Sequence, residues 1–129
     1  MKKPTIVLAD DSSRIHSAVR KLLSQQFDIV DCVLNGEQAV EAVMRLQPDV
    51  VVLDVVMPQL DGIQTARRLK ELVKIPKIVF LTGIEDPDYI KTASDLGHGF
   101  VFKSCMRKDL ALAITAALDG GTFYSSKKK

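Results

Sequence analysis

Residues 50–54 read Val50-Val51-Val52-Leu53-Asp54, a short apolar run that stops at a carboxylate. A continuous apolar run of this length is typical of a central strand that is covered on both faces of a parallel sheet. Three further apolar runs also stop at polar side chains: residues 5–9 before Asp10 and Asp11, residues 78–81 before Thr82, and residues 100–102 before Lys103. Segments with apolar residues at helical spacing lie between these runs. This alternation predicts β-α units and a parallel sheet.

Turn and cap residues divide the chain into five such units. Strands are predicted near residues 4–9, 28–33, 50–54, 77–82 and 99–102. Ser12 or Asp11 can cap the first helix, and Asn35 with Gly36 begins the second. Leu96-Gly97 predicts a helix that ends in a left-handed glycine. Right-handed crossovers then favour a doubly wound α/β sheet with strand order 2-1-3-4-5 and five helices.

Length and composition indicate one soluble domain. The 129 residues suffice for a single core, and we expect residues 1–119 to form the domain and 120–129 a tail or the start of a linker. The net charge of +2 includes Lys127, Lys128 and Lys129, so bulk charge gives little affinity for nucleic acid.

Cys32 and Cys105 lack metal-ligand spacing and are predicted to be reduced thiols. No apolar run approaches the roughly 18 residues of a membrane span, so we expect a cytoplasmic protein without membrane contacts.

The polar residues after the strands predict one site. Parallel strands bring their carboxyl ends to the same edge of the sheet, and ligands bind there at the point where the strand order reverses. Asp10, Asp11 and Asp54 would meet at that point. Three neighbouring carboxylates repel one another unless a cation joins them, and Mg²⁺ prefers such oxygen ligands.

Phosphoryl chemistry suits these residues. One aspartate of the cluster could attack phosphorus and form an aspartyl phosphate. Lys103 could hold a phosphoryl oxygen, Thr82 could donate a hydrogen bond to another, and Gly83 leaves space beside it. Each residue alone has an ordinary explanation as a helix cap, a solvated lysine or a strand threonine. Helix capping does not require polar residues at four different strand ends, and this joint placement favours the functional interpretation.

The same residues carry a family resemblance over nearly the whole chain. The matching pieces are Asp10-Asp11, Asp54-Val55-Val56-Met57-Pro58 with Asp61-Gly62, Thr82-Gly83, and Phe100-Val101-Phe102-Lys103. Together they resemble the response-regulator receiver domain of two-component signalling. The resemblance implies a flavodoxin-like fold and a signalling domain that is not an enzyme beyond its own phosphorylation and dephosphorylation.

Roles for single residues follow from the resemblance. Asp54 is similar to the phospho-acceptor, and Asp11 and Asp54 to direct Mg²⁺ ligands that are joined by the backbone carbonyl of Val56. Asp10 would bind the metal largely through water. Thr82 and Lys103 match the pair that contacts the phosphoryl group. Phe100 occupies the position of the switch aromatic. Its interpretation as a core phenylalanine is compatible with the switch and would apply in one of the two states.

The resemblance also implies partners and an output. A sensor histidine kinase would donate the phosphoryl group, and the face formed by the fourth helix, fifth strand and fifth helix would change, with a homodimer possible on phosphorylation. Residues 116–125 resemble the end of receivers from LuxR-type DNA-binding regulators. DNA binding would then require a domain absent from this chain. The alternative is a free-standing receiver that acts by protein–protein contact.

Three positions depart from the family pattern. Ser104 follows Lys103 where many members have a proline after a cis peptide, so we expect a trans bond or a strained loop. Val56 and Ile84 lie two residues after Asp54 and Thr82, beside the position of the attacking water. Neither apolar side chain can orient that water by hydrogen bonding, which predicts a long-lived phosphoryl group.

Two other classes of function fit the sequence less well. A haloacid-dehalogenase-like phosphatase also uses an aspartate and Mg²⁺, but it needs a second acid where this chain has Val56. A binding module without the phosphorylation switch would not need the carboxylate cluster. His16 and His98 have no partner at ligand spacing and are predicted to be ordinary surface residues.

Overall fold

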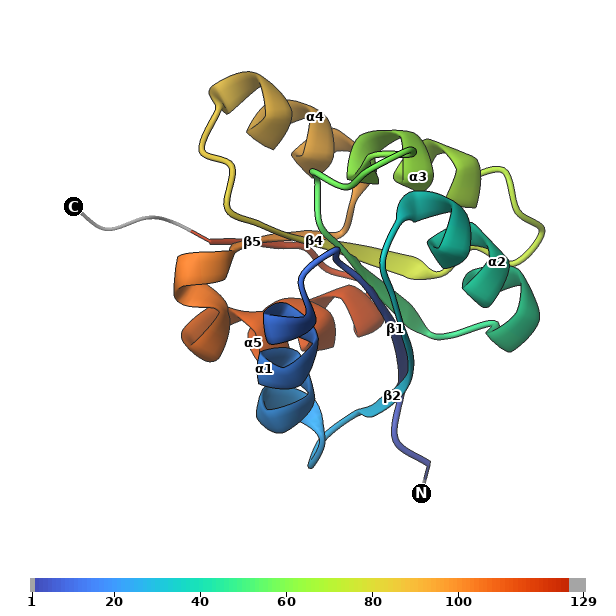
Figure 1. The fold of residues 1–129 in the computed structure, drawn as a ribbon. Helices are drawn as coiled ribbons and strands as arrows, with labels where there is room; N and C mark the ends of the chain where they lie inside the picture. Colours follow the sequence, from blue (N-terminus) through green and yellow to red (C-terminus); the bar gives the residue numbers. More distant parts are fainter. Residues whose placement is uncertain (1, 126–129) are drawn as a thin grey trace.

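The computed structural model describes residues 2–125 (Figure 1). The strands are β1 (Thr5–Ala9), β2 (Asp28–Val33), β3 (Val50–Leu53), β4 (Lys77–Thr82), β5 (Gly99–Phe102) and β6 (Phe123–Tyr124). The helices are α1 (Ser13–Leu23), α2 (Gly36–Leu46), α3 (Gly62–Leu69), α4 (Pro87–Leu96) and α5 (Met106–Leu118), with a 3₁₀ turn at Lys103–Cys105. All five predicted strands are present.

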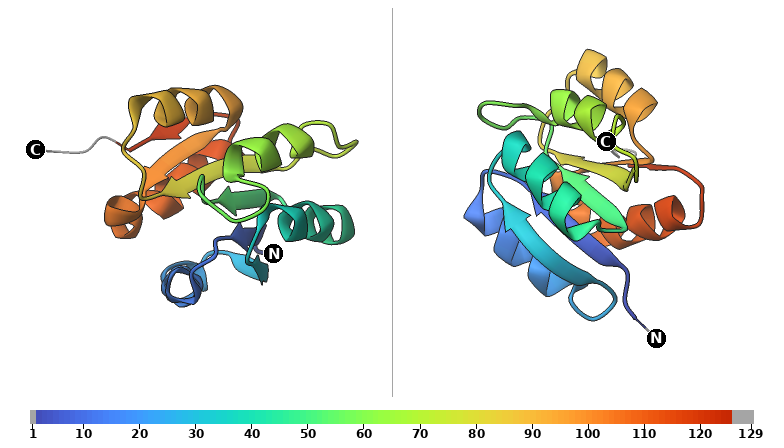
Figure 2. Two further views of the ribbon diagram at one scale, coloured as in Figure 1. Left: turned by 45° about the horizontal axis from the view of Figure 1, so that its top comes forward. Right: turned by 90° about the vertical axis from the view of Figure 1, so that its right-hand side faces the viewer.

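A parallel sheet with strand order β2-β1-β3-β4-β5-β6 forms the middle layer. Helices α1 and α5 cover one face, and α2, α3 and α4 cover the other (Figures 1 and 2). Alternate residues of β3 face the two layers: Val50 and Val52 pack towards α1 and α5, whereas Val51 and Leu53 pack towards the other three helices. All four are fully buried, as expected for a central strand. The predicted flavodoxin-like order 2-1-3-4-5 is therefore confirmed.

The sheet has a sixth strand that the sequence did not predict. Residues 123–124 were expected to lie in a tail, but Phe123 and Tyr124 pair in parallel with Gly99 and Phe100 of β5. A strand of two residues is too short to show a periodic pattern. Its pairing depends on the edge that β5 offers, which only the tertiary structure reveals.

The helix ends explain several polar and glycine positions. Ser12, rather than Asp11, caps α1 by accepting a hydrogen bond from the amide of Ile15. The prediction of a left-handed Gly97 is wrong, because its φ is −107°. Space explains this glycine instead: a Cβ atom there would lie 2.8 Å from the ring of Phe80.

His98 is half-buried and lies directly before β5, held against β4, rather than being the ordinary surface residue that was predicted. Its backbone amide donates to the carbonyl of Ile78 at 2.7 Å, and its Nδ1 accepts from the amide of Ile78 at 3.1 Å. Burial, together with the charges of Lys77 and Lys70, lowers the pKa of His98. The neutral ring is required, because a protonated Nδ1 could not accept the hydrogen bond.

This histidine should make stability depend on pH. Because the folded state lowers the pKa of His98 below the ordinary value of about 6.5, the unfolded chain binds more protons below that pH. We expect the free energy of unfolding to be highest above about pH 6.5 and to fall as pH drops through the folded pKa. Urea unfolding of wild type and His98→Gln at several pH values measures this, and the variant should show the weaker decline. Equal declines in the two proteins would contradict a role for His98, because the other histidine, His16, is present in both.

Candidate functional site

The carboxyl edge of the sheet gathers the predicted acidic residues. Ala9 pairs with Leu53, so the ends of β1 and β3 lie side by side, and the next residues are Asp10 and Asp54. Carboxylate oxygens of Asp10, Asp11 and Asp54 lie within 4.8 Å of one another. Asp10 and Asp54 are buried, whereas Asp11 is exposed. The three predicted acidic residues therefore lie together, and Asp11 is the member of the cluster that is exposed to solvent.

Backbone amides orient the two buried carboxylates. Oδ1 of Asp10 accepts a hydrogen bond from the amide of Ser12 at 2.9 Å, and Oδ1 of Asp54 accepts one from the amide of Val56 at 3.2 Å. The main chain of Asp54 is itself held by a bond from its amide to the carbonyl of Ala9 at 2.9 Å. The loop after each strand thus determines where each carboxylate points.

Lys103 joins the cluster from the end of β5. Its Nζ donates to Oδ2 of Asp54 at 3.0 Å and lies 2.9 Å from Oδ2 of Asp10. Burial alone would lower the pKa of Lys103, but its contacts with Asp10 and Asp54 outweigh burial and raise that pKa. Lys103 therefore stays charged, and one ammonium bridges two carboxylates.

Opposing effects act on the pKa of Asp54, and the net result is a raised pKa. Burial is the largest effect and raises its pKa, and the neighbouring charge of Asp10 acts in the same direction. Hydrogen bonds from Lys103 and from the amide of Val56 work against this rise. A carboxylate whose charge is costly in the protein alone gains most from an added cation.

The site fits a divalent metal. Oδ2 of Asp10 is buried and accepts no hydrogen bond from the described residues, so the Lys103 ammonium is its charge partner there. Three carboxylates, two of them buried and sharing a single ammonium, form a hard-cation donor set, so Asp10, Asp11 and Asp54 could hold Mg²⁺.

Thr82 and Gly83 lie at the end of β4, on the same edge. Thr82 is buried, and its hydroxyl accepts a hydrogen bond from the amide of Ile84 at 3.1 Å. Within residues 2–125 no hydrogen bond joins Thr82 to Asp54 or Lys103. A Cβ atom at Gly83 would meet nothing within 4 Å, which agrees with the space expected there.

Phe100 points into the core. Its side chain is only 2% exposed and packs edge-to-face on Phe102, with ring centroids 5.3 Å apart. Among the described residues no peptide bond is cis, so the bond between Lys103 and Ser104 is trans, one of the two expected outcomes. The trans bond leads directly into the 3₁₀ turn at Lys103–Cys105.

Two residues that support the site were not predicted from the sequence to do so. Nε2 of His16 lies 2.7 Å from the backbone carbonyl of Asp10, so the ring can donate to it and tie α1 to the end of β1. Gly62 begins α3 and its amide donates to the carbonyl of Val55 at 2.8 Å. Only the Asp61-Gly62 motif hinted at the second role, and nothing in the sequence indicated the first.

Gly62 should be intolerant of a side chain. A Cβ atom there would overlap the backbone oxygen of Asp54 and lie 2.8 Å from the Cα atom of Val55. Because backbone atoms cannot rotate away, we expect Gly62→Ala to cost about 2–3 kcal/mol and to weaken Mg²⁺ binding at Asp54. Gly83→Ala is the matched stability control and should stay within about 0.5 kcal/mol. Chemical unfolding checks both values, and equal stabilities would contradict the clash.

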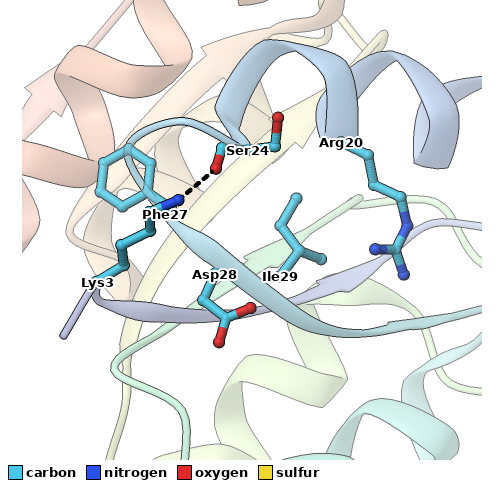
Figure 3. A pocket seen from close by; sticks show the side chains of 6 residues that line it. All are labelled: Lys3, Arg20, Ser24, Phe27, Asp28 and Ile29. Atoms are coloured by element: carbon cyan, nitrogen blue, oxygen red, sulfur yellow. Dashed lines mark hydrogen bonds between the residues drawn. The ribbon is translucent and has the colours of Figure 1, made fainter.

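A separate pocket lies at the opposite edge of the sheet. It has a volume of about 420 Å³ and lies between the end of α1 and the start of β2 (Figure 3). Nζ of Lys3 donates to the carbonyl of Ser24 across it. The pocket shares no residue with the acidic cluster.

Comparison with known proteins gives the family. The family model for the response regulator receiver domain matches residues 6–115. The chain belongs to the response-regulator receiver domain family. The chain is 32% identical over 123 residues to the uncharacterized transcriptional regulatory protein YvfU of Bacillus subtilis, and this match covers 93% of the chain and 62% of YvfU. It is also 32% identical over 114 residues to the chemotaxis protein CheY of Halobacterium salinarum, covering 88% of the chain and 95% of that relative.

Solved structures give the same result. The signal receiver domain of the putative response regulator NarL from Mycobacterium tuberculosis is 25% identical and superposes with a TM-score of 0.87, covering 93% of the chain and 99% of that domain. The isolated REC domain of RcsB from Salmonella enterica has the same fold, at 24% identity and a TM-score of 0.87, with 97% and 95% covered. The chain thus has the fold of receivers from LuxR-type regulators, but it spans less than two thirds of YvfU.

Proposed function

We propose that this receiver stores a signal as a phosphoryl group on Asp54. The observation that carries the proposal is the contact of one lysine with two buried carboxylates: Lys103 Nζ lies 2.9 Å from Asp10 and 3.0 Å from Asp54. Asp11 completes the cluster at the solvent side. A charged acceptor, a metal-binding acidic pair and a fixed cation are the components that phosphoryl transfer requires.

Asp54 performs the transfer step. One oxygen of its carboxylate forms a bond to phosphorus while the bond from phosphorus to the imidazole nitrogen of a phosphohistidine donor breaks. Asp11, Asp54 and the backbone carbonyl of Val56 would hold Mg²⁺, and Asp10 would act largely through water. When bound, the metal would supply charge that offsets the phosphoryl oxygens. Lys103 then pairs with a phosphoryl oxygen in place of a carboxylate. A sensor histidine kinase is the proposed donor, which places the reaction in the cytoplasm.

Thr82 and Phe100 carry the signal to the surface. The hydroxyl of Thr82 leaves the amide of Ile84 and donates to a phosphoryl oxygen, and Gly83 gives it room. Phosphorylation favours the inward position of Phe100, which is the one in the structure, over an outward position. The face made by α4, β5 and α5 changes as a result, as expected for a bistable element that a local charge biases.

The proposed output is transcription. YvfU and DesR of Bacillus subtilis are named as transcriptional regulatory proteins, and one RcsB structure contains dimers bound to DNA. By analogy, residues 1–119 form the receiver, residues from 120 onward begin a linker, and phosphorylation promotes a homodimer. DNA contact would need a domain outside this chain. The match to CheY over nearly its full length supports the alternative, a free-standing receiver that acts through protein contacts.

Acetyl phosphate tests the proposal without a kinase. Incubation with Mg²⁺ should add one phosphoryl group to the intact mass, and hydroxylamine, which cleaves acyl phosphates, should remove it. Omission of Mg²⁺ with a chelator should prevent the adduct. A protein that remains unmodified at saturating acetyl phosphate would refute the proposed function, and slow turnover of a generic phosphate ester would instead indicate a phosphatase.

The phosphoryl group should be long-lived. Val56 is 53% exposed and Ile84 is half-buried, and neither can orient a water molecule towards phosphorus. General-base assistance is commonly worth about 10²-fold or more. We expect the adduct to outlast that of Val56→Gln by about tenfold or more, measured by mass after removal of acetyl phosphate. Val56→Leu is the apolar control, and loss of the wild-type adduct within seconds would contradict the prediction.

A further inference from the structure

Strand β6 is attached to three different elements. The amide of Phe123 donates to the carbonyl of His98 at 3.2 Å, and the amide of Ser125 donates to the carbonyl of Phe100 at 2.8 Å. The hydroxyl of Tyr124 reaches the carbonyl of Ser94 on α4 at 3.3 Å. The short segment after α5 is therefore bound to the edge of β5 and also to α4.

A buried carboxylate forms the third attachment. Asp109 lies in the first turn of α5 with only 4% of its surface exposed, and its Oδ2 accepts a hydrogen bond from the Ser125 hydroxyl at 2.8 Å. Buried charges are costly unless they are hydrogen-bonded. Since undocking of β6 would remove this bond, Asp109 favours the docked position of Ser125.

Tyr124 lies beside the proposed switch residue. It is the register partner of Phe100 in the parallel pair β5–β6, so both side chains point to the same face of the sheet. That face is the one covered by α4, because Phe100 packs with Ala93 in the core and Tyr124 reaches Ser94. Phe100 is buried, while Tyr124 is 46% exposed and covers the edge of the sheet next to it. An outward turn of Phe100 would bring its ring towards the edge of the sheet where Tyr124 lies.

We propose that β6 is a clamp that holds Phe100 inward and is thereby coupled to the phosphoryl site at Asp54. The proposal rests on the proposed function and adds a regulatory role for residues 120–125. Docked β6 and inward Phe100 stabilise each other, so occupation of Asp54 tightens the clamp. Coupling between two sites is reciprocal, so loosening the clamp must weaken binding at Asp54 by the same factor.

Amide hydrogen exchange measures the first half of this coupling. The amides of Phe123 and Ser125 report docking directly, because both donate to β5 or to the residue before it. With Mg²⁺ and the phosphoryl mimic beryllofluoride, we expect both amides to exchange at least about fivefold more slowly than with Mg²⁺ alone. Fluorine NMR records in the same sample whether beryllofluoride is bound.

Three variants measure the second half. Tyr124→Ala removes the ring beside Phe100, and we expect it to raise the apparent dissociation constant for beryllofluoride roughly fivefold or more. Tyr124→Phe keeps the ring but loses the bond to Ser94, so its effect should be smaller. Thr122→Ala changes an exposed residue of the same segment and should leave the affinity unchanged.

The outcomes separate the clamp from the proposed function. Bound beryllofluoride with unchanged exchange at Phe123 and Ser125, or equal affinities of Tyr124→Ala and Thr122→Ala, would overturn the clamp and leave phosphorylation at Asp54 intact. Absence of beryllofluoride binding to the folded wild type would overturn both. Slower exchange together with weaker binding to Tyr124→Ala would support the clamp.

Discussion

Substitution of Asp54 by asparagine should abolish the phosphoryl adduct that acetyl phosphate forms in the presence of Mg²⁺. The carboxamide has nearly the same shape as the carboxylate, so the fold should persist. It lacks the negative charge and the nucleophilic oxygen that bond formation to phosphorus requires. Intact mass spectrometry measures the result, and we expect the adduct of Asp54→Asn to fall below detection under conditions that modify the wild type fully.

Asp11→Asn is the matched control for that experiment. Asp11 belongs to the same cluster but is exposed, and its proposed role is to bind the metal rather than phosphorus. Its substitution should slow the reaction and raise the Mg²⁺ concentration required, while the adduct still forms on Asp54. A full adduct on Asp54→Asn would show that another residue is the acceptor. Complete loss of the adduct in both variants would contradict a purely metal-binding role for Asp11.

Most of the fold and the site could be predicted because their signals are local. Val50–Leu53 is apolar throughout, and Asp54 follows directly, so strand and site residue come from the same five letters. Parallel strand order then brings Asp10, Asp54 and Lys103 together without further information. The identity of each residue and its place at a strand end were enough to predict that these side chains lie together.

The features that were missed depend on distant partners. Strand β6 exists because β5 offers a free edge, and Gly97 is a glycine because the ring of Phe80 approaches it. The half-buried position of His98 depends on Ile78, which lies twenty residues earlier in strand β4. No pattern within a short window contains such contacts, whereas the caps at Ser12 and Asn35 were readable because their partners lie three residues away.

The second large effect concerns Lys103, whose removal should destabilise the protein and make Mg²⁺ stabilising. Lys103→Met keeps the length of the side chain but leaves Asp10 and Asp54 without their shared cation. Breaking a fully buried pair costs about 3–5 kcal/mol. The side chain of Lys103 is 25% exposed, so water replaces part of the interaction, and we expect a loss of about 2 kcal/mol in a chelator. Urea unfolding provides the measurement.

Lys91→Met is the control for loss of a lysine charge. Lys91 pairs with Asp95 at 3.8 Å on the surface of α4, with side-chain exposures of 79% and 70%. Exposed pairs contribute little, so this variant should change stability by less than about 0.5 kcal/mol and should not respond to Mg²⁺. If Lys103→Met were as stable as Lys91→Met in chelator, the bridging role of Lys103 would be refuted.

Mg²⁺ and pH should each compensate for the missing ammonium. A cation that binds the folded cluster and not the unfolded chain stabilises by mass action, so added Mg²⁺ should restore part of the loss in Lys103→Met. Burial already raises the pKa of Asp54, and Lys103 acts against this rise. Removal of Lys103 must therefore raise the pKa of Asp54 further. A raised folded pKa destabilises the protein as pH increases from the unfolded value of about 3.9 through the folded one. The deficit of Lys103→Met should therefore shrink in acid, and a deficit that is the same at acidic and neutral pH would show that the lost stability is packing rather than charge.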